Sequence, residues 1–170
     1  GVVLGAGGFE NDDEMRKKYW PNPTAAAWTC GSPCNTGDAI GMGTAGGAAL
    51  VLMDDAGWGP TTVVPGEDQA RMLVVEKSLP GCVFVNQRGE RFVDEAAPYI
   101  DIVNAMYENN KPDASCVPAY MVFDATYRKK YPCGPFLQSS QQPDWRLPKE
   151  FKQGYLRKDT TLAGLAEQMG

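Results

Sequence analysis

The 170-residue sequence contains no histidine. Histidine is the side chain that most often exchanges protons near neutral pH and the one that most often binds metals. Any proton transfer by this chain must therefore use carboxylates, tyrosine, lysine, cysteine or a cofactor. A serine nucleophile would also lack its usual activating base, so the common hydrolase arrangements are disfavoured.

Positive charge and long apolar runs are also scarce. The formal net charge is −5 and the isoelectric point is about 4.8, which argues against a nucleic-acid partner. No apolar run approaches the roughly 18 residues needed to cross a bilayer, so no transmembrane segment is expected. The first residues carry no basic stretch, and we do not interpret them as a signal peptide.

The five cysteines form an odd set without the spacing of a disulfide framework. Cys30 and Cys34 make a lone CxxxC, whereas a structural zinc site needs four ligands. We therefore expect reduced thiols, no metal site and a cytoplasmic protein.

Short elements in irregular order predict an α+β fold. We expect strands at residues 2–4, 83–86, 90–93 and 120–123, helices at 10–20, 39–53 and 162–169, and a short helix or turn at 124–131. The chain opens directly on a strand of the buried type and stops at a glycine in a helix C-cap position, so we expect a fragment of a longer protein.

The expected helix 39–53 is rich in glycine, and each glycine costs about 1 kcal/mol in a helix interior relative to alanine. Two explanations remain open: close approach to a flat or bulky group, or tight packing against a strand. At its start, Thr36 or Asp38 can act as an N-cap. Alternatively, the helix N-terminus and the Gly37 amide can meet a polar cofactor edge.

A second glycine-rich segment, residues 5–8, follows the first expected strand. A dinucleotide-binding GxGxxG turn would need glycine at position 10, which is Glu10. We therefore interpret this segment as a strand end that lies against a cofactor bound by other parts of the chain.

Residues 83–99 are expected to form a hairpin that delivers ionisable side chains to one place. Asp94 and Glu95 are adjacent and point to opposite sides of an extended chain, which predicts one surface acid and one acid paired with Arg91 or Arg88. Tyr99 is the candidate general base, provided that a neighbour stabilises its phenolate. Its alternative role is that of a packing residue.

Five segments in one order carry a family resemblance: residues 2–9, 35–40, 80–86, 89–95 and 158–166. Together they resemble the FAD-dependent fumarate reductase and 3-ketosteroid dehydrogenase superfamily. Fumarate reductases have an arginine shortly after the fourth segment, but here no arginine occurs between Glu95 and Arg128. Pro98 and Tyr99 are similar to the ketosteroid dehydrogenase branch, in which this tyrosine is associated with proton abstraction.

The resemblance implies a Rossmann-like FAD-binding domain interrupted by a substrate cap domain. Residues 1–60 would be the last part of the FAD-binding domain, and residues 61–170 an incomplete cap domain. Gly7, Gly8, Gly37 and Asp38 would lie near FAD.

The resemblance also implies an activity, the introduction of a C=C bond next to the ketone of a 3-ketosteroid-like substrate. Tyr99 would take the proton and FAD the hydride, and an external electron acceptor would reoxidise the cofactor. The fragment alone should bind FAD poorly and be inactive. The alternatives are a fumarate or enoate reductase of the same superfamily, and a non-enzymatic binding module.

Overall fold

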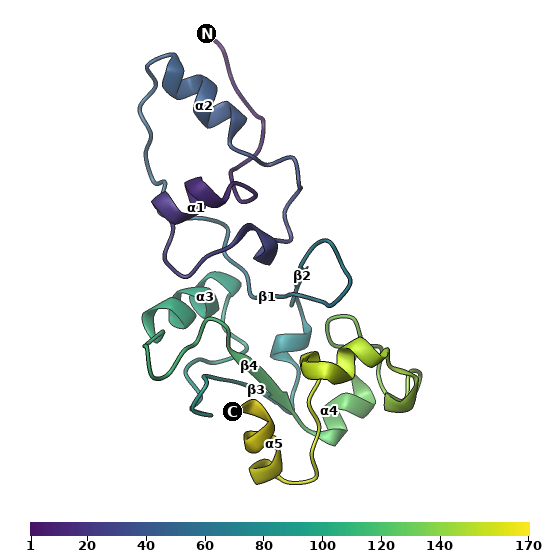
Figure 1. Cartoon of the computed structure of the whole chain (residues 1–170). Helices are drawn as coiled ribbons and strands as arrows, with labels where there is room; N and C mark the ends of the chain where they lie inside the picture. The colour runs from purple at the N-terminus through teal and green to yellow at the C-terminus, as the bar shows by residue number, and fades with distance from the viewer.

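The computed structural model describes residues 1–170 and has an α+β architecture of short helices and two small antiparallel sheets (Figure 1). The α-helices and strands are α1 (Asp13–Tyr19), α2 (Asp38–Ala45), β1 (Thr61–Thr62), β2 (Arg71–Met72), β3 (Cys82–Val85), α3 (Tyr99–Glu108), β4 (Tyr120–Phe123), α4 (Ala125–Lys130) and α5 (Leu162–Met169). Short turns complete it: η1 (Ala26–Trp28), η2 (Glu76–Ser78), η3 (Asp144–Arg146) and η4 (Phe151–Tyr155). No helix has both the length and the apolar character that crossing a membrane requires.

The longer sheet joins β3 to β4 in antiparallel register, from Cys82 opposite Phe123 to Val85 opposite Tyr120. Figure 1 shows this pair in the lower part of the molecule, with α3 above it and α4 and α5 beside it. The sheet therefore organises the second half of the chain.

Two hydrophobic clusters lie around that sheet. The larger contains Val64, Tyr127, Cys133, Phe136, Leu147 and Phe151, and the smaller contains Leu73, Phe84 and Ile102. Tyr127 is fully buried, and its hydroxyl donates a 2.8 Å hydrogen bond to the Glu76 carbonyl. This bond anchors the turn η2 to helix α4.

The first 60 residues form the upper part of Figure 1 around α1, η1 and α2. Their buried centre is small: Phe9 packs on Trp20 with ring centres 4.7 Å apart, and Trp20 packs on Trp58 at 5.0 Å. Arg16 is also buried; its guanidinium lies over Trp20 and donates to the Glu10 carbonyl. This centre is separate from both clusters of the second half.

Several expected elements are confirmed. The strand 120–123 is β4, and the elements expected at 124–131 and 162–169 are α4 and α5. Asp124 and Thr161 cap these two helices through their side chains. The expected helix 10–20 is α1, which begins later because Asp12 accepts from the Met15 amide as the N-cap.

The expected strand at residues 2–4 is wrong. Val2 and Val3 are 86 % and 96 % exposed, and no strand of this chain pairs with them. An apolar β-type sequence forms a strand only where a neighbouring strand accepts its backbone hydrogen bonds.

The expected return strand at residues 90–93 is also wrong. Gly89 has a positive φ of 76°, as the turn requires, but only one isolated bridge joins Val85 to Arg91. The Phe84 amide, which faces the edge of β3 away from β4, donates instead to the side chain of Glu95. A carboxylate thus replaces the return strand at this edge.

The glycine-rich helix is shorter than expected, and a further helix was missed. α2 ends at Ala45, because Gly46 is its C-cap and Gly47 adopts a φ of 86°. The missed helix is α3, which follows Pro98 and buries Ile102 and Val103. Its apolar positions 102, 103 and 106 have helical spacing, so the signal was present in the sequence.

The buried face of α3 provides a stability test. In the complete protein, Ile102→Ala should lower the free energy of unfolding by about 2–5 kcal/mol, because it leaves a cavity at a fully buried site. Denaturant unfolding measures this change. Ile100→Ala in the same helix is the matched control, since Ile100 is 47 % exposed, and an equal loss for both variants would contradict the described packing.

Candidate functional site

Three of the four candidate cofactor residues meet at one backbone junction. The Gly37 amide donates a 3.0 Å hydrogen bond to the Gly8 carbonyl. Gly7 has a φ of 80°, and a Cβ there would overlap the side chain of Asn35. Gly37 has a φ of 81°, and a Cβ would lie 2.5 Å from the Met15 sulfur. The junction therefore needs glycine for both conformation and space.

Asp38 follows this junction as the first residue of α2. The N-cap is Gly37, and no side chain caps the helix, so the expected capping by Thr36 or Asp38 is wrong. The Thr36 hydroxyl instead donates to the Asp38 carboxylate at 3.0 Å. The Asp38 side chain is exposed beside the free amides of the helix N-terminus.

The glycines inside α2 distinguish the two explanations given for them. A Cβ on Gly41 would have no neighbour within 4 Å, and one on Gly43 would only make ordinary contact with Ala48 at 3.7 Å. Tight packing against a strand is therefore not present within this chain. An open small-residue surface next to a glycine junction fits a flat cofactor with polar edges, such as the FAD that the resemblance implies.

A cavity of about 950 Å³ lies where the first 60 residues face the rest of the chain. Most of its lining is hydrophobic and includes Trp20, Trp28 and Trp58 from the first 60 residues and Phe84, Tyr120 and Phe136 from the rest of the chain. This size and lining are typical of sites for small apolar molecules. Gly8 also lines the cavity, whereas Gly7, Gly37, Asp38 and Tyr99 do not.

Tyr99 lies away from the glycine junction, in the second half of the chain. It is the first residue of α3, with Pro98 at the N-cap position. The side chain is half-buried, and the Lys77 ammonium lies 4.9 Å from the centre of its ring. The structure thus brings the four cofactor candidates together and leaves the candidate base on a separate element.

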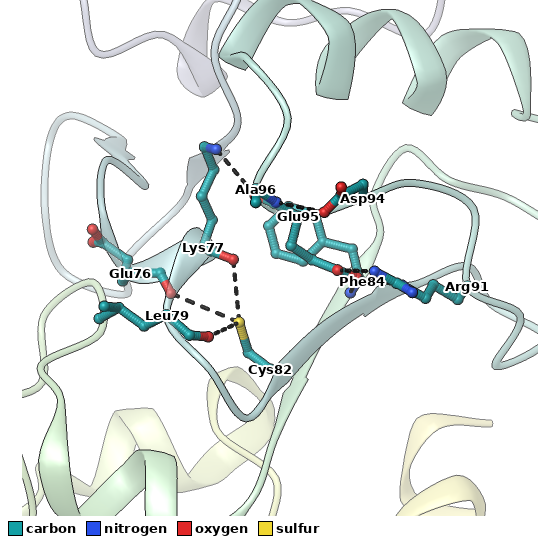
Figure 2. Close-up of polar contacts among 9 residues, drawn as sticks. All are labelled: Glu76, Lys77, Leu79, Cys82, Phe84, Arg91, Asp94, Glu95 and Ala96. Carbon is teal, nitrogen blue, oxygen red and sulfur yellow. Dashed lines mark hydrogen bonds and ion pairs between the residues drawn. The ribbon is translucent and has the colours of Figure 1, made fainter.

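The two neighbouring acids have the different environments that the sequence predicted. Asp94 is exposed and accepts a hydrogen bond from the Ala96 amide. Glu95 is buried and accepts from the Phe84 amide at 2.7 Å and from two Arg91 nitrogens at 3.1 and 2.6 Å (Figure 2). Burial raises the pKa of Glu95, but the bonds from Arg91 and Phe84 outweigh it, so the pKa lies below its ordinary value.

Two groups that the sequence analysis did not single out are withdrawn from solvent: Lys77 is buried and Cys82 is half-buried. Burial lowers the pKa of the Lys77 ammonium. The Cys82 thiol donates to the carbonyls of Lys77 and Leu79, each at 3.2 Å (Figure 2), and burial raises its pKa to about 11. Cys82 is therefore a structural thiol rather than a nucleophile. Nothing in the local sequence marks either residue as buried.

All five cysteines are free thiols, and Cys30 and Cys34 are both exposed. No group of three or more potential ligands gathers at one place in a way that could hold a metal ion.

The family model described as an FAD binding domain matches residues 1–161 of this chain. A 3-oxosteroid 1-dehydrogenase from Mycolicibacterium smegmatis is 38 % identical over all of this chain and 30 % of its own length. An NADH:acrylate oxidoreductase from Vibrio harveyi is 31 % identical over all of this chain and 16 % of its own.

A solved structure gives a closer likeness. The 3-ketosteroid delta1-dehydrogenase of Sterolibacterium denitrificans, in complex with 1,4-androstadiene-3,17-dione, is 45 % identical and superposes with a TM-score of 0.90. The match covers all of this chain and 30 % of that one. The chain thus spans about a third of the length of the dehydrogenases that it matches.

The paired carboxylate of Glu95 predicts a pH-dependent contribution to stability. Its folded-state pKa lies below the ordinary 4.5, so the ionised group stabilises the fold above that pH, and this stabilisation is lost as the pH falls through the folded-state pKa. In the complete protein, Glu95→Gln should lower the free energy of unfolding by about 1–3 kcal/mol at pH 7.

Denaturant unfolding of both proteins at neutral pH and again well below the pKa of a free carboxyl tests this prediction. The difference should shrink in acid. Asp94→Asn, at the exposed neighbour, is the control and should change stability little at either pH. A Glu95→Gln deficit that is the same at both pH values would contradict the assignment.

Proposed function

This chain belongs to the FAD binding domain family, and from that premise we propose that the complete protein is a flavin-dependent dehydrogenase of 3-ketosteroid-like substrates. The observation that carries the proposal is the match over the whole chain, at 45 % identity, to a 3-ketosteroid delta1-dehydrogenase structure that holds 1,4-androstadiene-3,17-dione. The large cavity lined by aromatic side chains also supports a flat apolar substrate.

We assign residues 1–60 to the end of a Rossmann-like FAD-binding domain and residues 61–170 to part of a substrate cap domain. Support comes from the packing, since both hydrophobic clusters consist of residues between Val64 and Phe151, whereas the first 60 residues have their own aromatic centre. Residues of both parts line the cavity, so a substrate bound there would contact the FAD-binding part and the cap part of the chain. A cytoplasmic location remains a prediction consistent with five free thiols.

In the proposed cofactor site, Gly7, Gly8 and Gly37 form the backbone junction that places the open start of α2 beside FAD, and Asp38 offers a carboxylate to a polar edge of the cofactor. The exposed α2 N-terminus supports this assignment, because its unpaired amides favour electronegative atoms. FAD, when bound, supplies the capacity to accept a hydride from carbon.

In the proposed reaction, Tyr99 takes a proton from the carbon next to the ketone. The electron pair that this C–H bond leaves behind forms the new C=C bond, because the neighbouring carbon would give up its hydride to bound FAD, which an external acceptor would reoxidise. The chain's own contributions are thus the Tyr99 phenol as the proton acceptor and the largely apolar cavity as a binding surface for the substrate.

Reduction of an enoate is the second candidate, favoured by the likeness to the acrylate oxidoreductase. A carboxylate substrate needs a free cation beside the reacting carbons. The two cations near Tyr99 are already engaged: Arg91 is paired with Glu95, and the Lys77 ammonium donates to two backbone carbonyls and the Ser78 hydroxyl. The dehydrogenase therefore has the stronger support.

The proton-abstraction role predicts a large kinetic effect. In the complete enzyme, Tyr99→Phe should lower kcat by about 10²–10⁴, because an acid–base group is lost. Steroid-dependent reduction of an artificial acceptor dye measures the rate, and visible absorption measures flavin content. Tyr131→Phe, which removes a phenol hydroxyl elsewhere in this half of the chain, is the matched control. Undiminished turnover by Tyr99→Phe would remove this residue from the mechanism.

The cofactor role of Asp38 predicts weaker FAD binding. Asp38→Ala should raise the FAD dissociation constant by roughly 10- to 100-fold, which corresponds to one lost bond to a charged group. Because the side chain is exposed, the stability of the apoprotein should change little. Titration of apoprotein with FAD measures the constant, and Asp54→Ala at another exposed acid is the control. A protein that binds no flavin at all would leave only the binding-module alternative.

A further inference from the structure

Lys77 is a buried ammonium that forms no direct ion pair, although the exposed Asp94 carboxylate favours its charged form from a greater distance. Only 3 % of the residue is exposed, and none of the chain's ion pairs includes it. Lysine is almost never buried in this way unless its charge is compensated, because removing an ammonium from water is costly. The position therefore calls for an explanation.

The three N–H groups of Lys77 all have acceptors, and these acceptors are neutral. The ammonium donates to the carbonyls of Glu95 at 3.0 Å and Ala97 at 2.8 Å, and to the hydroxyl of Ser78 at 3.3 Å. Figure 2 shows the side chain reaching from η2 to the backbone at Glu95 and Ala96. Two of the three bonds thus hold the short segment that leads into Pro98 and Tyr99.

The ammonium also lies over the Tyr99 ring, 4.9 Å from its centre. A cation at this distance from a phenol face is attracted by the ring, and the attraction strengthens when the cation is desolvated. One side chain therefore fixes both the backbone before Tyr99 and the face of its ring.

Other contacts hold Lys77 itself in place. The Cys82 thiol bonds to the carbonyl of Lys77, and the Tyr127 hydroxyl bonds to the carbonyl of Glu76. The turn η2 is therefore anchored to β3 and α4 independently of the ammonium. This separation allows the ammonium to be removed without removing the anchor of the turn.

We propose that Lys77 is a positioning residue for Tyr99, which it holds through the Glu95 and Ala97 carbonyls and through the face of the phenol ring. The inference rests on the proposed role of Tyr99 as the base. The charge of Lys77 suits this role. An ammonium can donate to two carbonyls and lie against an aromatic face at the same time, which a neutral side chain of the same length cannot do.

The test is a double-mutant cycle in the complete flavoprotein with Lys77→Met and Tyr99→Phe. Methionine keeps the length and the apolar stem but removes the charge and all three donors. Lys77→Met alone should lower kcat by about 10- to 100-fold, since a misplaced reacting group costs that much, with KM for the steroid and flavin content nearly unchanged. In the Tyr99→Phe background, the same substitution should have little further effect on kcat.

The outcomes separate this inference from the proposed function. If Tyr99→Phe retains full turnover, the proposed base is wrong. If Tyr99→Phe is slow and Lys77→Met lowers kcat equally in both backgrounds, Tyr99 keeps its role and the positioning role of Lys77 is wrong. An unchanged kcat for Lys77→Met would overturn it as well.

Two further variants keep the test decisive. Cys82→Ala removes one of the two anchors of η2, while the Tyr127 bond to the Glu76 carbonyl and the three ammonium contacts remain, so its kcat should stay within about twofold of the wild type. A loss as large as that of Lys77→Met would assign the effect to the turn instead. If Lys77→Met does not fold, Lys77→Gln, which keeps a donor but no charge, replaces it in the same cycle with the same expected non-additivity.

Discussion

The second half of the fold depends on how the free edge of β3 is satisfied. No strand pairs there; the buried carboxylate of Glu95 accepts the Phe84 amide and is itself held by Arg91. The backbone of the same segment accepts two bonds from Lys77. The anionic side chain of Glu95 and the cationic side chain of Lys77 thus both hold residues 94–97 in place. Since α3 begins immediately afterwards, these contacts set where Tyr99 and the buried face of α3 lie.

The first 60 residues depend on a different kind of constraint, which is the need for glycine at the positions where two backbone segments meet. Gly8 and Gly37 meet through a backbone hydrogen bond, and a Cβ at Gly37 would strike Met15. The same small residues leave the start of α2 and the surface around Gly41 open. A rigid backbone junction next to an open helix end is well suited to a cofactor, whereas the aromatic cavity beside it is suited to an apolar substrate.

Local signals in the sequence predicted elements whose stability is local. The elements expected at 124–131 and 162–169 are α4 and α5, whose starts are stabilised locally by the side-chain caps Asp124 and Thr161. Prediction failed where distant partners decide. Val2 and Val3 are apolar but have no neighbouring strand to pair with. Residues 90–93 do not form a strand beside β3, because the Glu95 carboxylate accepts the hydrogen bond of the Phe84 amide at that edge. The expected helix 39–53 is longer than α2, because Gly46 and Gly47 end the helix after Ala45.

For the site, the sequence by itself determined the chemistry that is available. The lack of histidine leaves carboxylates, tyrosine, lysine, cysteine or a cofactor for proton transfer. The ordered motifs indicate the flavoprotein family, and the Asp94–Glu95 pair implies one exposed and one paired acid. Only the tertiary structure decided which groups share a place. Lys77 and Glu95 are 18 residues apart, and Gly8 and Gly37 are 29 apart. Burial and hydrogen bonding between such distant residues depend on packing, which no local pattern specifies.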